Sequence, residues 1–269
     1  MGQARTRLEK FKQSNPYCCY CGGTSATESL DHVPARTFFY ERRRPKGFEV
    51  PACVRCNSVF ARFDSFFSLL SFTQASFLSG IRDSRLENLI SNAVKLFPDA
   101  TLQIVKNGRR DYFHVNGLLR KGVSIRFDHP DIQFTICFQV ARMVAAQFYE
   151  ARGVPLPLGS VIDATWHSNA QPMEKHNLER ILDALPNYAT LKQGSWSEEA
   201  QFEVRYNFSE TETVGACAFH FHRCFTGLGM LFPSLGEVKY EDEDLLFSVT
   251  RKGIEPARGT FPSQLRLPQ

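Results

Sequence analysis

Two Cys-x-x-Cys pairs stand near the start of the chain. The first joins Cys18 to Cys21 and the second joins Cys53 to Cys56. At this spacing two thiolates can face one ion from a tight turn, and two such turns complete the tetrahedral set of soft ligands that Zn²⁺ prefers. A redox dithiol would not explain a second pair. We therefore expect a closed structural zinc site, in which Cys19 is not a ligand.

The dipeptide Asp31-His32 lies between the two pairs, and Asn57 directly follows the last cysteine. Phosphodiester hydrolysis needs a base that activates water, a cation that stabilises the leaving oxyanion, and positive charge near the phosphate. His32 could be the base, and the oxygens of Asp31 and Asn57 suit Mg²⁺ or Mn²⁺. Arg36 could hold or neutralise the phosphate. An isolated Asp-His pair, however, is more often an ordinary surface pair in a loop.

The order of these segments resembles the HNH endonucleases, a family of ββα-metal nucleases with a four-cysteine zinc site. The matching segments are CCYCG, DHVPAR and VPACVRCN, which lie within about residues 17–67. The resemblance implies that Asp31 and Asn57 bind the catalytic divalent ion, that His32 is the general base, and that the four cysteines bind structural zinc. It also implies a β-hairpin that carries Asp31-His32 and a helix that begins near Asn57.

A few positions depart from the pattern of that family. Phe48 stands where many members have an asparagine, and Phe60 stands where a lysine often follows the final asparagine. Ala35-Arg36 replaces Pro-Lys but retains a cation, and Asp64 could match a common acidic residue. The alternative function is therefore a zinc-dependent module that binds nucleic acid without cutting it.

The basic residues are concentrated in the same N-terminal segment. Residues 1–62 carry 11 Lys/Arg against 5 Asp/Glu, a net charge of +6, whereas the remainder carries 21 against 23, or −2. Cations beside a phosphodiester-cutting site would contact backbone phosphates, so we expect DNA as the partner. A solvated charged loop is the plain alternative. The candidate nucleic-acid-binding residues are Arg42, Arg43, Arg44 and Lys46.

The bulk composition favours a globular protein. The chain has 269 residues, of which 43% are apolar, and its 24 Phe favour packed aromatic clusters. The N-terminus lacks the apolar segment of a signal peptide, and the most apolar run, residues 134–149, is too short to span a bilayer. We expect a soluble, cytoplasmic protein with no membrane partner.

The expected fold class is α+β. Residues 1–67 form the zinc-stabilised ββα-metal module, and residues 68–269 form a mixed α+β body that could oligomerise or serve a defence-system partner. The stretch CAFHFHRCF is interpreted as a plain strand rather than a second metal site. Helices are predicted near 5–13, 62–78, 85–97, 132–152 and 173–185. Strands are predicted near 101–106, 111–115, 123–127, 160–166, 200–208, 213–222 and 226–232.

Overall fold

The structure is a computed structural model. It describes residues 2–79, 84–115, 117–124, 129–168, 175–193, 196–197, 200–238 and 245–258. In this part of the chain the fold is mixed α+β, as expected, and its largest element is an antiparallel sheet of seven strands. Among the described residues, no helix is both long and apolar enough to cross a membrane.

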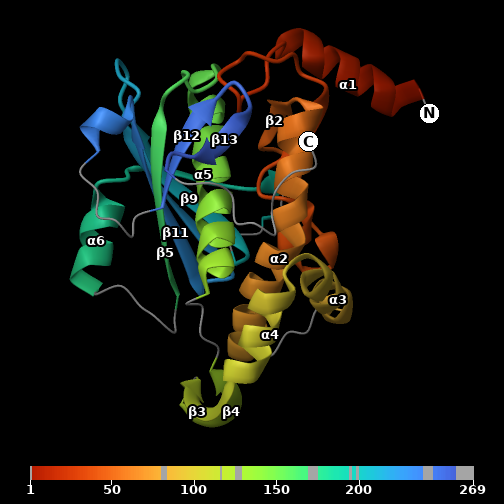
Figure 1. Cartoon of the computed structure of the whole chain (residues 1–269), viewed down its shortest axis with the longest axis vertical. Coiled ribbons are helices and arrows are strands. Elements are labelled where there is room, and N and C mark those ends of the chain that lie inside the picture. Colours follow the sequence, from red (N-terminus) through yellow and green to blue (C-terminus); the bar gives the residue numbers. More distant parts are fainter. Residues whose placement is uncertain are drawn as a thin grey trace.

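The seven-stranded sheet separates two helices, with α5 (Pro130–Arg152) along one face and α6 (Lys175–Asp183) on the opposite side (Figure 1). The strands predicted near 160–166, 200–208, 213–222 and 226–232 are confirmed, whereas three shorter strands at the two edges were not predicted. In spatial order the strands are β13 (Gly253–Pro256), β12 (Leu246–Thr250), β5 (Val161–Ser168), β11 (Phe225–Phe232), β10 (Gly215–Phe221), β9 (Phe202–Phe208) and β6 (Asn187–Thr190).

Helix α5 is buried along most of its length, and its boundaries follow local chemistry. Pro130 occupies the first turn, where a missing N–H costs nothing, and Gly153 ends the helix with a φ of 71°. The helix lies close to β11, because a Cβ added at Gly227 or Gly229 would come within 2.5 Å of a valine methyl on α5. The long helix predicted over 132–152 is confirmed.

The N-terminal part of the chain contains the helix–hairpin–helix arrangement that surrounds the candidate site. Strands β1 and β2 pair in antiparallel fashion, and α2 lies beside α5 (Figure 1). The two strands are joined by a loop that contains two short 3-10 helices, η1 (Arg36–Phe38) and η2 (Tyr40–Arg42). The elements are α1 (Gly2–Ser14), β1 (Ser29–His32), β2 (Glu49–Ala52) and α2 (Val54–Ser79).

A single apolar core joins this N-terminal part to the sheet. Phe60 and Phe63 of α2 contact Phe138 of α5, and Phe138 in turn contacts Phe247 of β12. Such ring pairs add roughly 0.5–1.5 kcal/mol each beyond the burial of their area. The aromatic clusters expected from the Phe content are confirmed. The boundary expected after residue 67 falls inside α2, so one helix belongs to both parts.

The segment between α2 and α5 differs from the prediction at two points. Strand β4 (Leu118–Ser124) begins five residues before the strand expected at 123–127. Residues 101–106 were expected to form a strand, but they lie in α4 (Pro98–Asn107). Pro98 and Asp99 favour the first turn of a helix, and Ala100 and Thr101 are buried with Ile104 partly buried one turn later. Residues 125–127 of the strand predicted at 123–127 lie outside the described residues. The remaining described elements are α3 (Leu86–Leu96), β3 (Arg109–Val115), β4 (Leu118–Ser124), β7 (Lys192–Gln193), β8 (Trp196–Ser197) and η3 (Leu235–Glu237).

Candidate functional site

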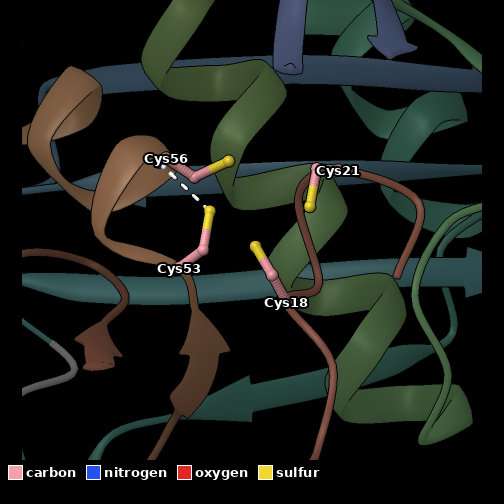
Figure 2. A group of neighbouring side chains, drawn as sticks. All are labelled: Cys18, Cys21, Cys53 and Cys56. Carbon is pink, nitrogen blue, oxygen red and sulfur yellow. Dashed lines mark hydrogen bonds between the residues drawn. The ribbon is translucent and has the colours of Figure 1, made fainter. Parts of the chain in front are cut away.

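The four cysteines of the two Cys-x-x-Cys pairs converge. The sulfur atoms of Cys18, Cys21, Cys53 and Cys56 all lie within 4.8 Å of one another, and all four residues are buried (Figure 2). Cys18 and Cys21 come from the loop before β1, whereas Cys53 ends the approach to α2 and Cys56 lies in its first turn. Among the described residues, this is the one group of three or more Cys, His, Asp or Glu side chains that is placed to hold a metal ion.

The cluster fits a metal ion such as zinc. In a tetrahedral site with Zn–S distances of about 2.3 Å the sulfurs would be about 3.8 Å apart, which needs only a small contraction here. Hydrogen bonding to Cys18 lowers the pKa of Cys53 to about 6, whereas hydrogen bonding to Cys18 raises the pKa of Cys56 above its usual value. Zn²⁺ binds cysteine in its thiolate form, so four converging thiols suit a cation. A metal ion here would fix the loop, the hairpin and the start of α2 together.

Two glycines allow the first cysteine turn to close. Gly22 and Gly23 have φ angles of 64° and 70°, the left-handed region that glycine adopts readily. A Cβ at Gly22 would lie 2.5 Å from the Leu158 side chain, and a Cβ at Gly253 of β13 would lie 3.0 Å from the sulfur of Cys56. The strand end and the loop of the body thus pack directly on the cysteine cluster.

Asp31 points into the interior of the protein, where its carboxylate is fully engaged. Arg142 of α5 donates from Nη2 to Oδ1 at 2.6 Å and from Nε to Oδ2 at 3.1 Å. The hydroxyl of Tyr20 donates to Oδ2 at 2.6 Å. Asp31 is 4% exposed, so this carboxylate is separated from solvent.

Arg142 also binds a second carboxylate. Its Nη1 donates to Oδ1 of Asp64 at 2.7 Å, and Gln139 donates to the same oxygen at 3.0 Å. The guanidinium lies over the ring of Phe60, 4.9 Å from the ring centre. Burial alone would lower the pKa of Arg142, but Asp31 and Asp64 raise it well above its usual value, so the side chain is charged.

His32 lies on the other face of β1 and has different partners. Its register partner across the hairpin is Glu49, and its Nδ1 lies 3.4 Å from Oε1 of Glu49. Arg7 of α1 donates to Oε2 of Glu49 at 2.5 Å. The His32 side chain is 25% exposed, although Nδ1 itself is buried and makes no hydrogen bond to Glu49 or to any other described residue. Burial and the charges of Arg44 and Arg36 lower the pKa of His32 to about 4, so the imidazole is neutral at pH 7.

Asn57 lies in the first turns of α2, as the resemblance implied. Its Nδ2 donates to the hydroxyl of Ser29 on β1 at 3.1 Å. The backbone N–H of Val54, at the start of the same helix, donates to the carboxylate of Glu28 at 2.9 Å. Both bonds tie the start of α2 to the hairpin. The Asn57 amide therefore reaches β1 at Ser29, whereas the carboxylate of Asp31 binds Arg142.

The catalytic divalent ion expected at Asp31 and Asn57 does not fit this arrangement. Both oxygens of Asp31 already accept strong hydrogen bonds, and a guanidinium lies within 2.6 Å of one of them. Mg²⁺ and Mn²⁺ need free oxygen lone pairs and usually retain several waters, which a buried carboxylate cannot provide. The Asp31 carboxylate is therefore not placed to support a metal-assisted step.

The basic loop contains one arginine that binds the backbone of the loop itself and several cations that are exposed. Arg44 donates to five backbone carbonyls, and its burial lowers its pKa to about 10. The Arg44 side chain therefore stabilises the conformation of the loop through these hydrogen bonds. The exposed cations of this region are Arg36, Arg42, Arg43 and Lys46, of which Arg43 lies 3.3 Å from Glu41.

The stretch that contains His220, His222 and Cys224 does not form one continuous strand. Strand β10 ends at Phe221, and His222 lies in the following turn with a φ of 52°. His222 Nε2 lies 2.9 Å from the carbonyl oxygen of Phe38, and His220 Nδ1 lies 2.9 Å from the hydroxyl of Thr226. The contact of His222 joins the sheet to the loop that follows β1, whereas the contact of His220 lies between β10 and β11 within the sheet.

No protein-family model matches the chain, and no curated protein or solved structure matches it significantly. The chemistry of the site therefore rests on its own residues. Those that the sequence interpretation missed are Tyr20, Glu49 and Arg142. A signal for Arg142 exists, because Gln139 and Arg142 are polar residues one turn apart in the otherwise apolar stretch 136–146 of α5. A buried charge at such a position requires a partner.

Proposed function

We propose that this chain is a zinc-stabilised endonuclease that hydrolyses DNA phosphodiester bonds, with His32 as the general base. The observation that carries the proposal is the environment of His32. The imidazole is neutral and partly exposed, its Nδ1 lies 3.4 Å from a Glu49 oxygen, and the charges of Arg44 and Arg36 act on it. The resemblance of the surrounding motifs to the HNH endonucleases supports the same assignment.

In the proposed mechanism Glu49 orients the base. We assign the tautomer in which Nδ1–H of His32 faces Oε1 of Glu49, which leaves Nε2 to take a proton from the attacking water. Arg7 binds the other oxygen of Glu49 and restrains it. A phosphodiester bound nearby would add negative charge, which offsets Arg36 and Arg44 and raises the pKa of His32 toward the range suited to a base.

The exposed cations around the hairpin would bind the DNA backbone. Arg36 lies close enough to His32 to lower its pKa, so a phosphate that contacts Arg36 lies near the base. Arg42, Arg43 and Lys46 are exposed on the adjoining loop and would contribute salt-sensitive affinity. The four cysteines would hold zinc, which contributes to folding and supplies no step of the hydrolysis.

A second function is favoured by one specific observation. The carboxylate of Asp31 binds Arg142, and Phe48 and Phe60 replace the family's usual asparagine and lysine. The same module would then bind nucleic acid through its exposed cations without cutting it. The two functions share the zinc site and the DNA contacts, and they differ only in whether His32 transfers a proton.

The experiment that separates them uses the zinc-loaded full chain with supercoiled plasmid, with and without added Mg²⁺ or Mn²⁺. Loss of a general base costs roughly 10²–10⁴-fold in rate, so His32→Ala is expected to lose nicking by at least that lower factor. DNA binding and zinc content should not change. His220→Ala, which removes a half-buried histidine of β10, is the matched control. If the wild type binds DNA but does not nick it, the second function replaces the first; if His32→Ala nicks as fast as the wild type, His32 is not the general base.

A further inference from the structure

We infer that the guanidinium of Arg142 is the permanent positively charged partner of the Asp31 carboxylate. Asp31 therefore positions the hairpin against α5 and binds no divalent ion. This goes beyond the proposed function, because it assigns roles to two residues that the His32 chemistry does not use. It also holds or fails independently of whether the chain cuts DNA.

The hydrogen bonds leave one lone pair of the Asp31 carboxylate open, on Oδ1 beside the guanidinium. Arg142 binds the two oxygens through two different nitrogens, a paired contact that suits the planar guanidinium. Tyr20 occupies a second lone pair of Oδ2 at 2.6 Å. An ion that reached the remaining lone pair of Oδ1 would lie beside a fixed positive charge. Repulsion between two cations at that distance is strong in a buried site.

Arg142 is also held too firmly to move aside for an ion. Its side chain is 2% exposed and projects from the middle of a buried helix. Asp64 binds its other terminal nitrogen, and Gln139 and Phe60 border the same group. Breaking a buried pair by removing one partner is strongly unfavourable, because the remaining charge has no compensation. If an ion displaced Arg142, the Arg142 guanidinium and the Asp64 carboxylate would both remain buried without a partner of opposite charge.

Arg142 is the cation that binds both carboxyl groups of the cluster. Asp31 and Asp64 contribute two carboxylates and Arg142 one guanidinium, while the Tyr20 hydroxyl and the Gln139 amide supply neutral donors. Burial raises the pKa of Asp64, and the neighbouring Arg142 counteracts that rise. The guanidinium thus supplies the positive charge that both carboxyl groups contact, and the cluster has a net charge of −1 when both are ionised.

This assignment explains why the hairpin and the body form one unit. Asp31 is on β1, Asp64 is on α2, and Arg142 is on α5, so one side chain joins all three elements. The position of β1 relative to α2 also sets where His32 projects on the opposite face. Asp31 and Arg142 are therefore positioning residues for the outward face of the hairpin.

The first test uses the wild-type protein and needs no substitution. We would add Mn²⁺ to the zinc-loaded full chain and follow the backbone amides of β1 and the Nε–H of Arg142 by ¹⁵N NMR. We expect the Arg142 Nε–H signal to persist and the amide of Asp31 to broaden no more than the average buried amide. Selective broadening around Asp31 together with loss of the Arg142 Nε–H signal would overturn the inference.

The second test compares Mn²⁺ affinities by electron paramagnetic resonance. Asp31→Asn is compared with the wild type, and Glu49→Gln is the matched control that removes a carboxylate from the other face of the hairpin. We expect less than a twofold change in affinity for Asp31→Asn, or no measurable binding in either protein. A folded Asp31→Asn protein that loses more than tenfold in affinity would contradict the inference. If that variant does not fold, the wild-type spectra decide, and neither readout depends on nuclease activity.

Discussion

Asp31 and His32 are neighbours in the sequence, but they lie on opposite faces of β1 and belong to different environments. Asp31 faces inward, where it is 4% exposed and bound to Arg142, whereas His32 faces outward beside Glu49 and the exposed arginines. Successive side chains of a strand point to opposite faces, so adjacency in the sequence does not imply a shared site. Asp31 therefore makes a structural contact, whereas His32 is the candidate for chemistry.

Both faces depend on the cysteine cluster, so its removal should have the largest effect. Cys53→Ser is expected to abolish binding of the structural metal and to unfold the hairpin, because structural zinc contributes on the order of 10 kcal/mol to small sites. Cys19→Ser alters a buried cysteine outside the cluster and is expected to retain the metal. Metal content by mass spectrometry of the native protein and far-UV circular dichroism would measure the difference. Equal metal content in the two variants would be inconsistent with the assigned ligands.

Removal of Arg142 tests the inward face alone. Arg142→Met should destabilise the protein by about 3–5 kcal/mol, because Asp31 and Asp64 would remain buried without their cation. Arg251→Met, at an exposed arginine, is expected to change the free energy of unfolding by less than about 0.5 kcal/mol. Urea denaturation of both variants measures the contrast. A near-neutral effect of Arg142→Met would mean that the inward face contributes little to the fold.

Acid should act mainly through the outward face. His32 has a pKa of about 4 in the folded protein and about 6.5 when unfolded, so the unfolded state binds more protons between these values. The stability that the neutral His32 contributes is present above pH 6.5 and is lost as the pH falls toward 4. His32→Gln should therefore remove roughly 1–3 kcal/mol of pH-dependent stability over that interval. Parallel stability curves for the two proteins between pH 7 and 4 would show that His32 is not held neutral.

The smallest effect is expected at Glu49. Its charge raises the pKa of His32 against the lowering by burial and the two arginines, so Glu49→Gln should move that pKa further below 4. The change in overall stability should be under about 1 kcal/mol, because the ion pair with Arg7 is largely exposed on the arginine side. NMR titration of the His32 ring protons measures the shift. An upward shift would refute the orientation assigned to this pair.

Local signals made part of the site predictable from the sequence. The spacing of the four cysteines specifies their convergence, because each Cys-x-x-Cys turn brings two sulfurs to one side. Pro130 and Gly153 frame α5, and alternating apolar residues indicate four central strands of the sheet. Each of these signals is local: two cysteines in one turn, a proline or glycine at one helix end, or alternation along one strand. DNA binding, cytoplasmic location, a homo-oligomer and a defence-system partner stay predictions.

The remaining features depend on contacts between distant segments. Arg142 is 111 residues from Asp31, and no local period of the sequence indicates that they meet. The sequence predicts Arg44 as a phosphate-binding cation, yet five carbonyl groups of the folded loop surround it. Residues 101–106 have the composition of a strand but form a helix, because Pro98 starts one and the core accepts its buried side. In all three cases the tertiary packing, rather than the local sequence, determines the structure.

Arg142, rather than a divalent ion, is the partner of Asp31. The role of the hairpin depends on this pairing. Anomalous scattering from crystals of the full chain soaked in MnCl₂ is the sharpest test of this pairing, because it locates manganese and zinc separately. We predict zinc among Cys18, Cys21, Cys53 and Cys56, an intact pair between Arg142 and Asp31, and no manganese at that carboxylate. A manganese ion coordinated by Asp31, with Arg142 displaced, would contradict the pairing.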